Sequence, residues 1–151
     1  MQAELLALEA TRLRLLELID ADAEAFAPLA AAYGLPRGTE EETAAQRAAL
    51  QVALVDACEV PLEIMRQCVQ VIESCVFMAK HGSVLALSDA GAAVVLAKAA
   101  LLSASLNVRI NIGSMADKAR AKAYRDQMED LIAAGGTLAD DVYAGVVERL
   151  G

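Results

Sequence analysis

The stretch Ser88–Ile112, SDAGAAVVLAKAALLSASLNVRINI, decides the fold class of this chain. Apolar side chains occur on nearly every side of the helix that it predicts, and only three charged residues interrupt it, Asp89, Lys98 and Arg109. A helix that is apolar all round belongs in the middle of a bundle or in a membrane. One row is small and polar and ends in Asn107 and Asn111 at i,i+4 spacing. We predict a central, closely packed helix whose two amides bond to protein or to a ligand.

This helix is long enough to cross a membrane, but its charges argue against that location. Lys98 lies near its middle and Arg109 near its end, where charged side chains make insertion costly. The N-terminus also lacks the basic, apolar and small-residue pattern of a signal peptide. We therefore expect no membrane association and a cytoplasmic location.

Composition favours one all-helical domain spanning residues 1–151. The chain is 57% hydrophobic but only 3% aromatic, and alanine and leucine supply most of its apolar content. Close-packed helices use these residues more readily than strands do. The net charge of -8 argues against a nucleic-acid-binding protein, because no basic patch replaces the counterions of a phosphate backbone.

Metal and cofactor sites are not expected. The three cysteines form no CxxC motif, and Cys68 and Cys75 share one helix face as small buried hydrophobes would. His81 is the single histidine, and its place at the end of a predicted helix suits the helix dipole.

Proline and glycine divide the chain into about six helices. We place breaks at Gly34–Gly38, before Pro61, at Gly82, at Gly113-Ser114 and at Gly135-Gly136. Thr39 with Glu42 forms a capping box. Short loops between such helices predict an antiparallel bundle. The predicted helices cover residues 4–33, 39–59, 61–81, 88–112, 117–133 and 137–149.

Asp22 stands out in the first helix. It lies four residues after Leu18 and seven before Leu29, inside the apolar stripe of that helix. A carboxylate on a core-facing stripe is costly unless it is paired, protonated or facing a cavity, and such groups concentrate at working sites. A structural acid, bonded to an asparagine or to a helix N-terminus, explains the spacing equally well.

Five stretches together resemble a known family. They are Asp20-Ala21-Asp22-Ala23-Glu24-Ala25-Phe26, Ala32-Tyr33-Gly34-Leu35-Pro36, Val60-Pro61-Leu62, Ser88-Asp89-Ala90-Gly91 and Ala104-Ser105-Leu106-Asn107-Val108-Arg109-Ile110-Asn111. In this order and spacing the chain resembles the cyclodeaminase/cyclohydrolase family. That family comprises the cyclodeaminase domain of formiminotransferase-cyclodeaminase and the bacterial methenyltetrahydrofolate cyclohydrolases.

The resemblance implies an all-helical homodimer that binds a reduced folate and works without a metal. It implies hydrolysis of 5,10-methenyltetrahydrofolate to 10-formyltetrahydrofolate, or cyclodeamination of 5-formiminotetrahydrofolate. The family's important acid falls on Asp22. We take Asn107, Asn111 and Asp89 as candidates for binding the pterin or orienting Asp22. Bonds between helices are the alternative for the two asparagines, and charge stabilisation of a helix N-terminus is the alternative for Asp89.

Two departures from the family pattern keep a second hypothesis open. The sequence lacks the family's Pro-Gly-Gly-Gly-Ser stretch, and the segment Gly82–Leu87 is apolar where the family often has asparagines. The alternative is therefore a shortened, non-catalytic helical module that dimerises or binds a partner.

Overall fold

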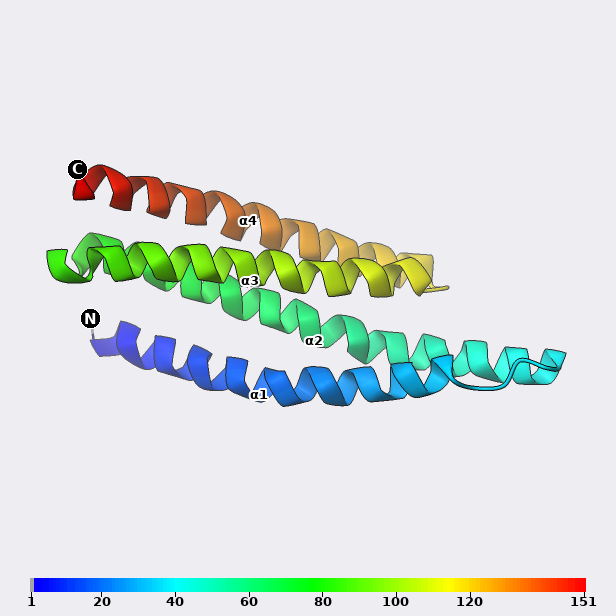
Figure 1. The fold of residues 1–151 in the computed structure, drawn as a ribbon. Helices are drawn as coiled ribbons and strands as arrows, with labels where there is room; N and C mark the ends of the chain where they lie inside the picture. Colours follow the sequence, from blue (N-terminus) through cyan, green and yellow to red (C-terminus); the bar gives the residue numbers. More distant parts are fainter. Residues whose placement is uncertain (1) are drawn as a thin grey trace.

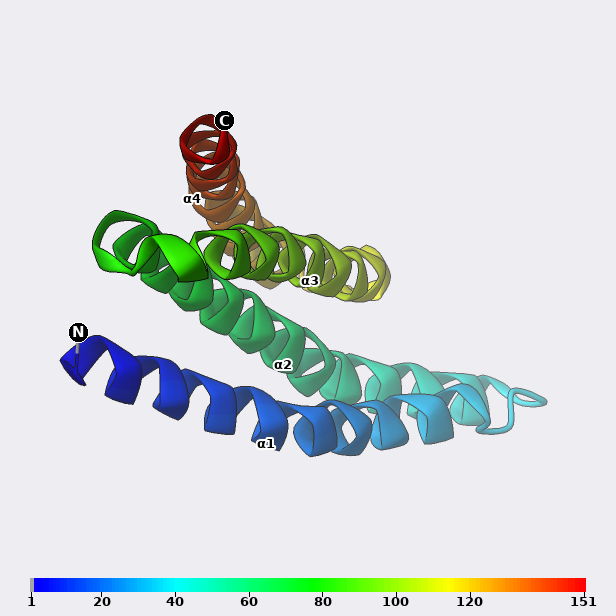
Figure 2. The same cartoon turned by 60° about the vertical axis from the view of Figure 1, so that its left-hand side comes forward.

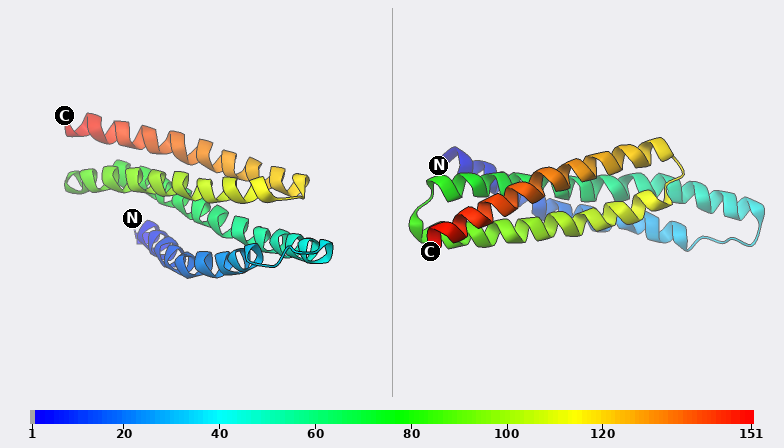
Figure 3. Two further views of the ribbon diagram at one scale, coloured as in Figure 1. Left: turned by 45° about the vertical axis from the view of Figure 1, so that its right-hand side comes forward. Right: turned by 90° about the horizontal axis from the view of Figure 1, so that it is seen from above.

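The structure is a computed structural model that describes residues 2–151. It consists of four long helices and one short 3-10 helix: α1 (Gln2–Tyr33), α2 (Glu40–His81), η1 (Val84–Ala86), α3 (Leu87–Ser114) and α4 (Lys118–Leu150). Successive long helices run in opposite directions (Figure 1), so α1 begins at the end of the bundle where α4 ends (Figure 3). Residues 2–151 contain no β-strand. The predicted all-α class is confirmed, but the chain forms four long helices rather than about six.

Pro61 does not start a new helix, because α2 continues through it. Proline has no N–H, so the carbonyl four residues earlier, that of Ala57, receives no bond within the helix. The side-chain amide of Asn111 on α3 donates to this oxygen instead, at 2.6 Å. A contact from another helix thus replaces the missing backbone bond, which a reading of local breakers could not anticipate.

The pair Gly135-Gly136 is likewise not a turn, because α4 runs through it. A Cβ atom on Gly135 would lie 2.6 Å from Cδ2 of Leu101 and 3.1 Å from Cγ2 of Val69. This glycine is therefore used for its small size, which lets α4 lie close to α2 and α3.

Several helix ends follow the sequence signals. Thr39 and Glu42 form the predicted capping box at the start of α2, and α2 ends before Gly82 as expected. The Asp117 side chain accepts from the N–H of Arg120 at the start of α4. The start of α3 differs, because this helix begins at Leu87, one residue before the predicted start, and has no side-chain cap.

The helix at the centre is α2 rather than α3. It packs against α1, α3 and α4, whereas α3 contacts only α2 and α4 among the long helices, and α1 contacts only α2. Figures 1 and 2 both show α2 lying between α1 and α3. The largest fully buried side chains come from all four helices: Leu18, Leu54, Leu62, Met65, Ile72, Leu101, Met128, Val94, Val108, Pro61 and Cys58.

The three cysteines are buried and free, as expected of small hydrophobes. Burial, with the neighbouring Glu59 carboxylate adding to it, raises the pKa of Cys58 to about 12. Burial alone raises the pKa of Cys68 to about 11. These thiols stay protonated near neutral pH and are poor nucleophiles.

One face of α3 remains uncovered. The segment Val84–Ser114 is long and apolar enough to cross a membrane, a test that a core helix also passes. In this structure α3 packs on α2 and α4, and Lys98 Nζ forms an ion pair with Asp140 of α4 at 2.6 Å. We therefore interpret it as a bundle helix. Its exposed large side chains form rows along one face: Val95, Leu96, Leu102, Leu106 and Ile110.

A second uncovered apolar row lies on α1. Leu18 and Leu29 of the apolar stripe are buried against the bundle, but Ile19, Phe26 and Tyr33 on the same helix are exposed. Phe26 of α1 and Ile110 of α3 line one hollow with Ala57 and Pro61 of α2, so the two exposed rows border the same face of α2. We call this face, with the exposed rows of α1 and α3, the open side.

Candidate active site

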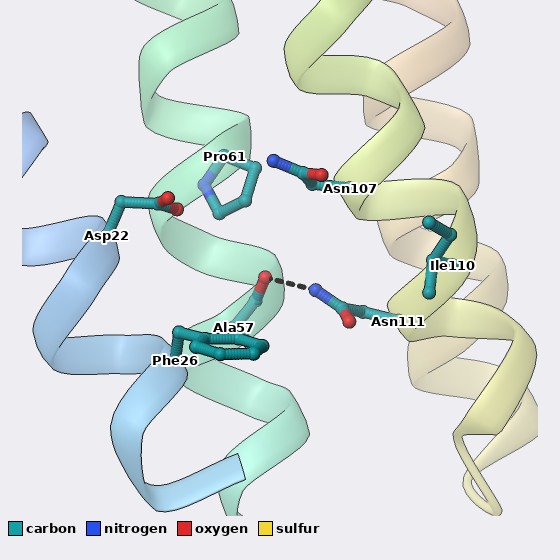
Figure 4. A pocket seen from close by; sticks show the side chains of 7 residues that line it. All are labelled: Asp22, Phe26, Ala57, Pro61, Asn107, Ile110 and Asn111. Atoms are coloured by element: carbon teal, nitrogen blue, oxygen red, sulfur yellow. Dashed lines mark hydrogen bonds between the residues drawn. The ribbon is translucent and has the colours of Figure 1, made fainter. Parts of the chain in front are cut away.

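A hollow of about 290 Å³ lies on the open side, between α1, α2 and α3. Its size is near the lower end of small-molecule sites. Seven residues line it: Asp22, Phe26, Ala57, Pro61, Asn107, Ile110 and Asn111. Three helices that are distant in sequence thus bring three of the four predicted site residues together (Figure 4).

Asp22 is the only ionisable residue that lines the hollow. It is half-buried, so the predicted position in the core is wrong, because the apolar stripe around it is itself partly exposed. Its carboxylate points across the ring of Pro61 toward α3 (Figure 4). The acid therefore faces a cavity, which is one of the three conditions under which its place on the stripe is tolerable.

Asn111 is the anchored amide of the site. Its Nδ2 donates to the Ala57 carbonyl at 2.6 Å, and this is the only side-chain hydrogen bond among the seven lining residues (Figure 4). A carbonyl oxygen can only accept, so the amide must direct its nitrogen toward Ala57. Asn111 therefore forms the bond between helices that was the alternative to a role in binding. Its Oδ1 has no partner among the other lining residues.

Asn107 lies one helical turn before Asn111 and is exposed. Its amide points toward the Pro61 ring and toward Asp22 on the opposite wall (Figure 4). No other lining residue bonds to it, so either its oxygen or its NH2 group is free to meet a ligand.

Asp89 does not line the hollow. It is exposed in the first turn of α3, eighteen residues before Asn107. At 1.5 Å per residue the two lie roughly 27 Å apart along the helix. Within one chain, Asp89 therefore cannot contact a ligand held by the other three, and its place favours the alternative, stabilisation of the helix N-terminus.

Four further residues of the site were not predicted from the sequence. Pro61 and Ala57 form its floor, and Phe26 and Ile110 supply apolar surface. Phe26 and Ile110 are 61% and 69% exposed, although both are large apolar side chains. A usable signal did exist for Ala57, because a proline four residues later leaves its carbonyl free inside a helix.

The hollow combines a carboxylate, two amides and apolar walls. The carboxylate can accept or return a proton, and the amides can hold the polar edges of a flat heterocycle. Among residues 2–151, no group of three or more histidine, cysteine, aspartate or glutamate side chains could hold a metal ion. The carboxylate and the two amides themselves offer proton transfer and electrostatic stabilisation.

Comparison with known proteins gives consistent matches. Residues 1–130 match the sequence model of the family described as formiminotransferase-cyclodeaminase. A methenyltetrahydrofolate cyclohydrolase from Methylorubrum extorquens is 40% identical over 142 residues, which are 94% of this chain and 68% of the relative. The formimidoyltransferase-cyclodeaminase of Rattus norvegicus is 32% identical over 136 residues, which are 90% of this chain and 25% of the relative.

A solved structure matches as well. The formiminotetrahydrofolate cyclodeaminase of Thermotoga maritima superposes with a TM-score of 0.70 at 27% identity. The match covers 94% of this chain but 65% of the Thermotoga chain. The chain thus spans a quarter to about two thirds of the length of these proteins.

Proposed function

The chain belongs to the formiminotransferase-cyclodeaminase family, and from this premise we propose that it is a folate one-carbon enzyme with its active site at the hollow. The reaction that we favour is hydrolysis of 5,10-methenyltetrahydrofolate to 10-formyltetrahydrofolate. The Methylorubrum cyclohydrolase supports this reaction. It is more similar to the chain than the Rattus formimidoyltransferase-cyclodeaminase is, and a larger share of its length is matched. Cyclodeamination of 5-formiminotetrahydrofolate is the second candidate, supported by the Thermotoga structure.

The observation that carries the proposal is the single carboxylate facing two amides across a hollow. In 5,10-methenyltetrahydrofolate the bridge carbon joins two nitrogens in a cationic amidinium and is already electrophilic. An ionised Asp22 stabilises this cation when it is bound and accepts a proton from the water that adds to the bridge carbon. The same carboxyl group then returns a proton to ring nitrogen N5 as its bond to carbon breaks, while the added hydroxyl loses its own proton to solvent and becomes the formyl carbonyl. One water is consumed and one proton is released overall.

The lining residues also suit the shape of the substrate. A reduced pterin contains a flat pyrimidine ring with polar N–H and carbonyl edges. Phe26 and Ile110 offer apolar surface to its face, while Asn107 and Asn111 lie one turn apart on α3 to meet its edge. The absence of a cofactor and a cytoplasmic location stay predictions.

A homodimer is proposed as the assembled form. The exposed apolar rows of α1 and α3 border the hollow, and contiguous apolar surface of this kind marks an interaction site. A second copy packed on the open side would remove these rows from water and enclose the ligand.

The decisive experiment measures the loss of 5,10-methenyltetrahydrofolate absorbance on adding the purified chain. We expect a rate above the spontaneous one that falls about 10²–10⁴-fold in Asp22→Asn. Asp20→Asn is the matched control, because Asp20 is an exposed aspartate on the same helix that does not line the hollow. Full activity in Asp22→Asn would exclude its catalytic role. No rate in the parent protein would favour the non-catalytic helical module.

A further inference from the structure

The floor of the hollow contains an arrangement that the catalytic proposal does not use. Pro61 is fully buried inside α2 and withholds the N–H that Ala57 would otherwise receive. A buried carbonyl without a donor costs free energy, so it binds the nearest available donor, Nδ2 of Asn111. The proline thus determines which end of the Asn111 amide is occupied.

The other end of that amide remains accessible. Among the described residues no buried side-chain oxygen or nitrogen lacks a partner. Oδ1 of Asn111 bonds to no other lining residue and points away from Ala57 (Figure 4), so it is open to solvent at the hollow. An amide whose nitrogen is held by one of its two N–H groups cannot turn over, so Oδ1 is fixed as the acceptor that it offers to the ligand.

We propose that Pro61 is a positioning residue that fixes the polarity of this site. Pro61 leaves the Ala57 carbonyl free to bind the NH2 group of Asn111, and this bond fixes Oδ1 as an acceptor for an N–H donor of the reduced pterin. This inference rests on the proposed function for the identity of the ligand. Together with the Asp22 carboxylate, it makes the wall of the hollow rich in acceptors, which suits a cationic substrate edged with N–H groups.

The arrangement separates two roles of Asn111 that a single substitution would mix. Asn111→Ala removes the acceptor and also leaves the Ala57 carbonyl unpaired. Pro61→Ala supplies a backbone N–H that can bond to this carbonyl within α2. In the double variant, which combines Asn111→Ala with Pro61→Ala, the Ala57 carbonyl therefore has a backbone donor again while the Oδ1 acceptor stays absent.

The test compares thermal stability and kinetics with 5,10-methenyltetrahydrofolate. We expect Asn111→Ala to lower Tm by roughly 2–6 °C and to raise KM roughly threefold to tenfold with little change in kcat. In the double variant Tm should return toward the parent value while KM stays raised. Pro61→Ala alone should also raise KM, because its Asn111 amide is released. A double variant that regained the parent KM would overturn the proposal, since Asn111 would then act only by supporting α2.

Pro28→Ala is the matched control, because Pro28 lies inside α1 but does not line the hollow. It should leave KM unchanged.

A ligand-free measurement distinguishes this inference from the proposed function. Hydrogen exchange of the Asn111 side-chain NH2, assigned by its absence in Asn111→Ala, should be slow in the parent and faster in Pro61→Ala. If the parent showed no turnover but slow exchange, the folate assignment would fail while the captured amide stood. Equal exchange in both proteins would overturn the positioning role of Pro61 whatever the turnover.

Discussion

The two sides of α2 use the same kinds of residues for opposite purposes. On the side shared with α3 and α4, which we call the closed side, Leu101 and Met128 are fully buried and Gly135 brings the backbones together. On the open side, Phe26 is 61% exposed and Leu106 is 59% exposed. Apolar composition alone therefore does not locate the core. The hollow lies between α1 and α3, which flank α2 without contacting one another.

The difference is clearest within α3. Leu101 and Leu106 are five residues apart, chemically identical, and lie on opposite faces of the helix, one buried and one exposed. The closed face holds the bundle together, and the open face is available to a ligand or to a second copy.

The largest effect on folding is expected from Leu101→Ala. Removing a fully buried leucine forfeits its transfer free energy and leaves a cavity, so the free energy of unfolding should fall by about 2–5 kcal/mol. Leu106→Ala on the open face is the control and should cost less than about 1 kcal/mol. Urea unfolding at low protein concentration measures both. Equal losses would mean that the two faces are equally packed, contrary to the structure.

A smaller effect is expected from filling the glycine on the closed side. Gly135→Val places carbon atoms where Leu101 and Val69 already lie, so it should destabilise the chain by about 1–3 kcal/mol. Gly136→Val should be neutral or slightly stabilising, because its Cβ would meet nothing within 4 Å and valine favours the helix over glycine. A comparison of their melting temperatures decides whether this pair serves packing, and the reverse ranking would favour the turn that the sequence suggested.

The features that the sequence predicted correctly are those that depend on local patterns of residues. The helical class follows from composition and periodicity, and the start of α2 follows from the capping box of Thr39 and Glu42. The prediction failed at Pro61 and Gly135, where contacts between helices override the local preference for a break. Proline and glycine usually interrupt a helix, but here each is accommodated by a contact with an atom on another helix.

Three of the residues that line the hollow were singled out for a different reason. Asp22 was identified because a carboxylate interrupts an apolar stripe, and Asn107 and Asn111 because they end a small, polar row on an otherwise apolar helix. Such interruptions are visible in a sequence. A sequence does not show which helices face one another. The exposure of Phe26 and Ile110 and the distance of Asp89 from the hollow could therefore be found only in the structure.

A more modest effect is expected from alkaline pH, and it again comes from the closed interior. Burial raises the pKa of Cys68 to about 11, and burial with the Glu59 carboxylate raises that of Cys58 to about 12, whereas an unfolded thiol titrates near pH 8.5. Because the folded pKa is the higher one, this contribution is full below about pH 8.5 and is lost as pH rises toward 11–12. Urea unfolding from pH 8 to pH 11 should show falling stability. Cys58→Ala should show a shallower decline, and an unchanged slope would mean that this thiol does not contribute.

The smallest effect on the folded chain is expected from Leu106→Asp, although it should abolish self-association. Leu106 is 59% exposed, so an aspartate there remains hydrated in a single chain and costs little. In a homodimer packed on the open side the same carboxylate would be buried without a partner, which is strongly unfavourable. Sedimentation should show a dimer for the parent and a monomer for the variant. The parent's melting temperature should also rise with protein concentration while that of the variant stays constant, because only a folded dimer is stabilised by mass action. A variant that sedimented as a dimer would place the interface elsewhere, and a monomeric parent would leave the open side to the folate alone.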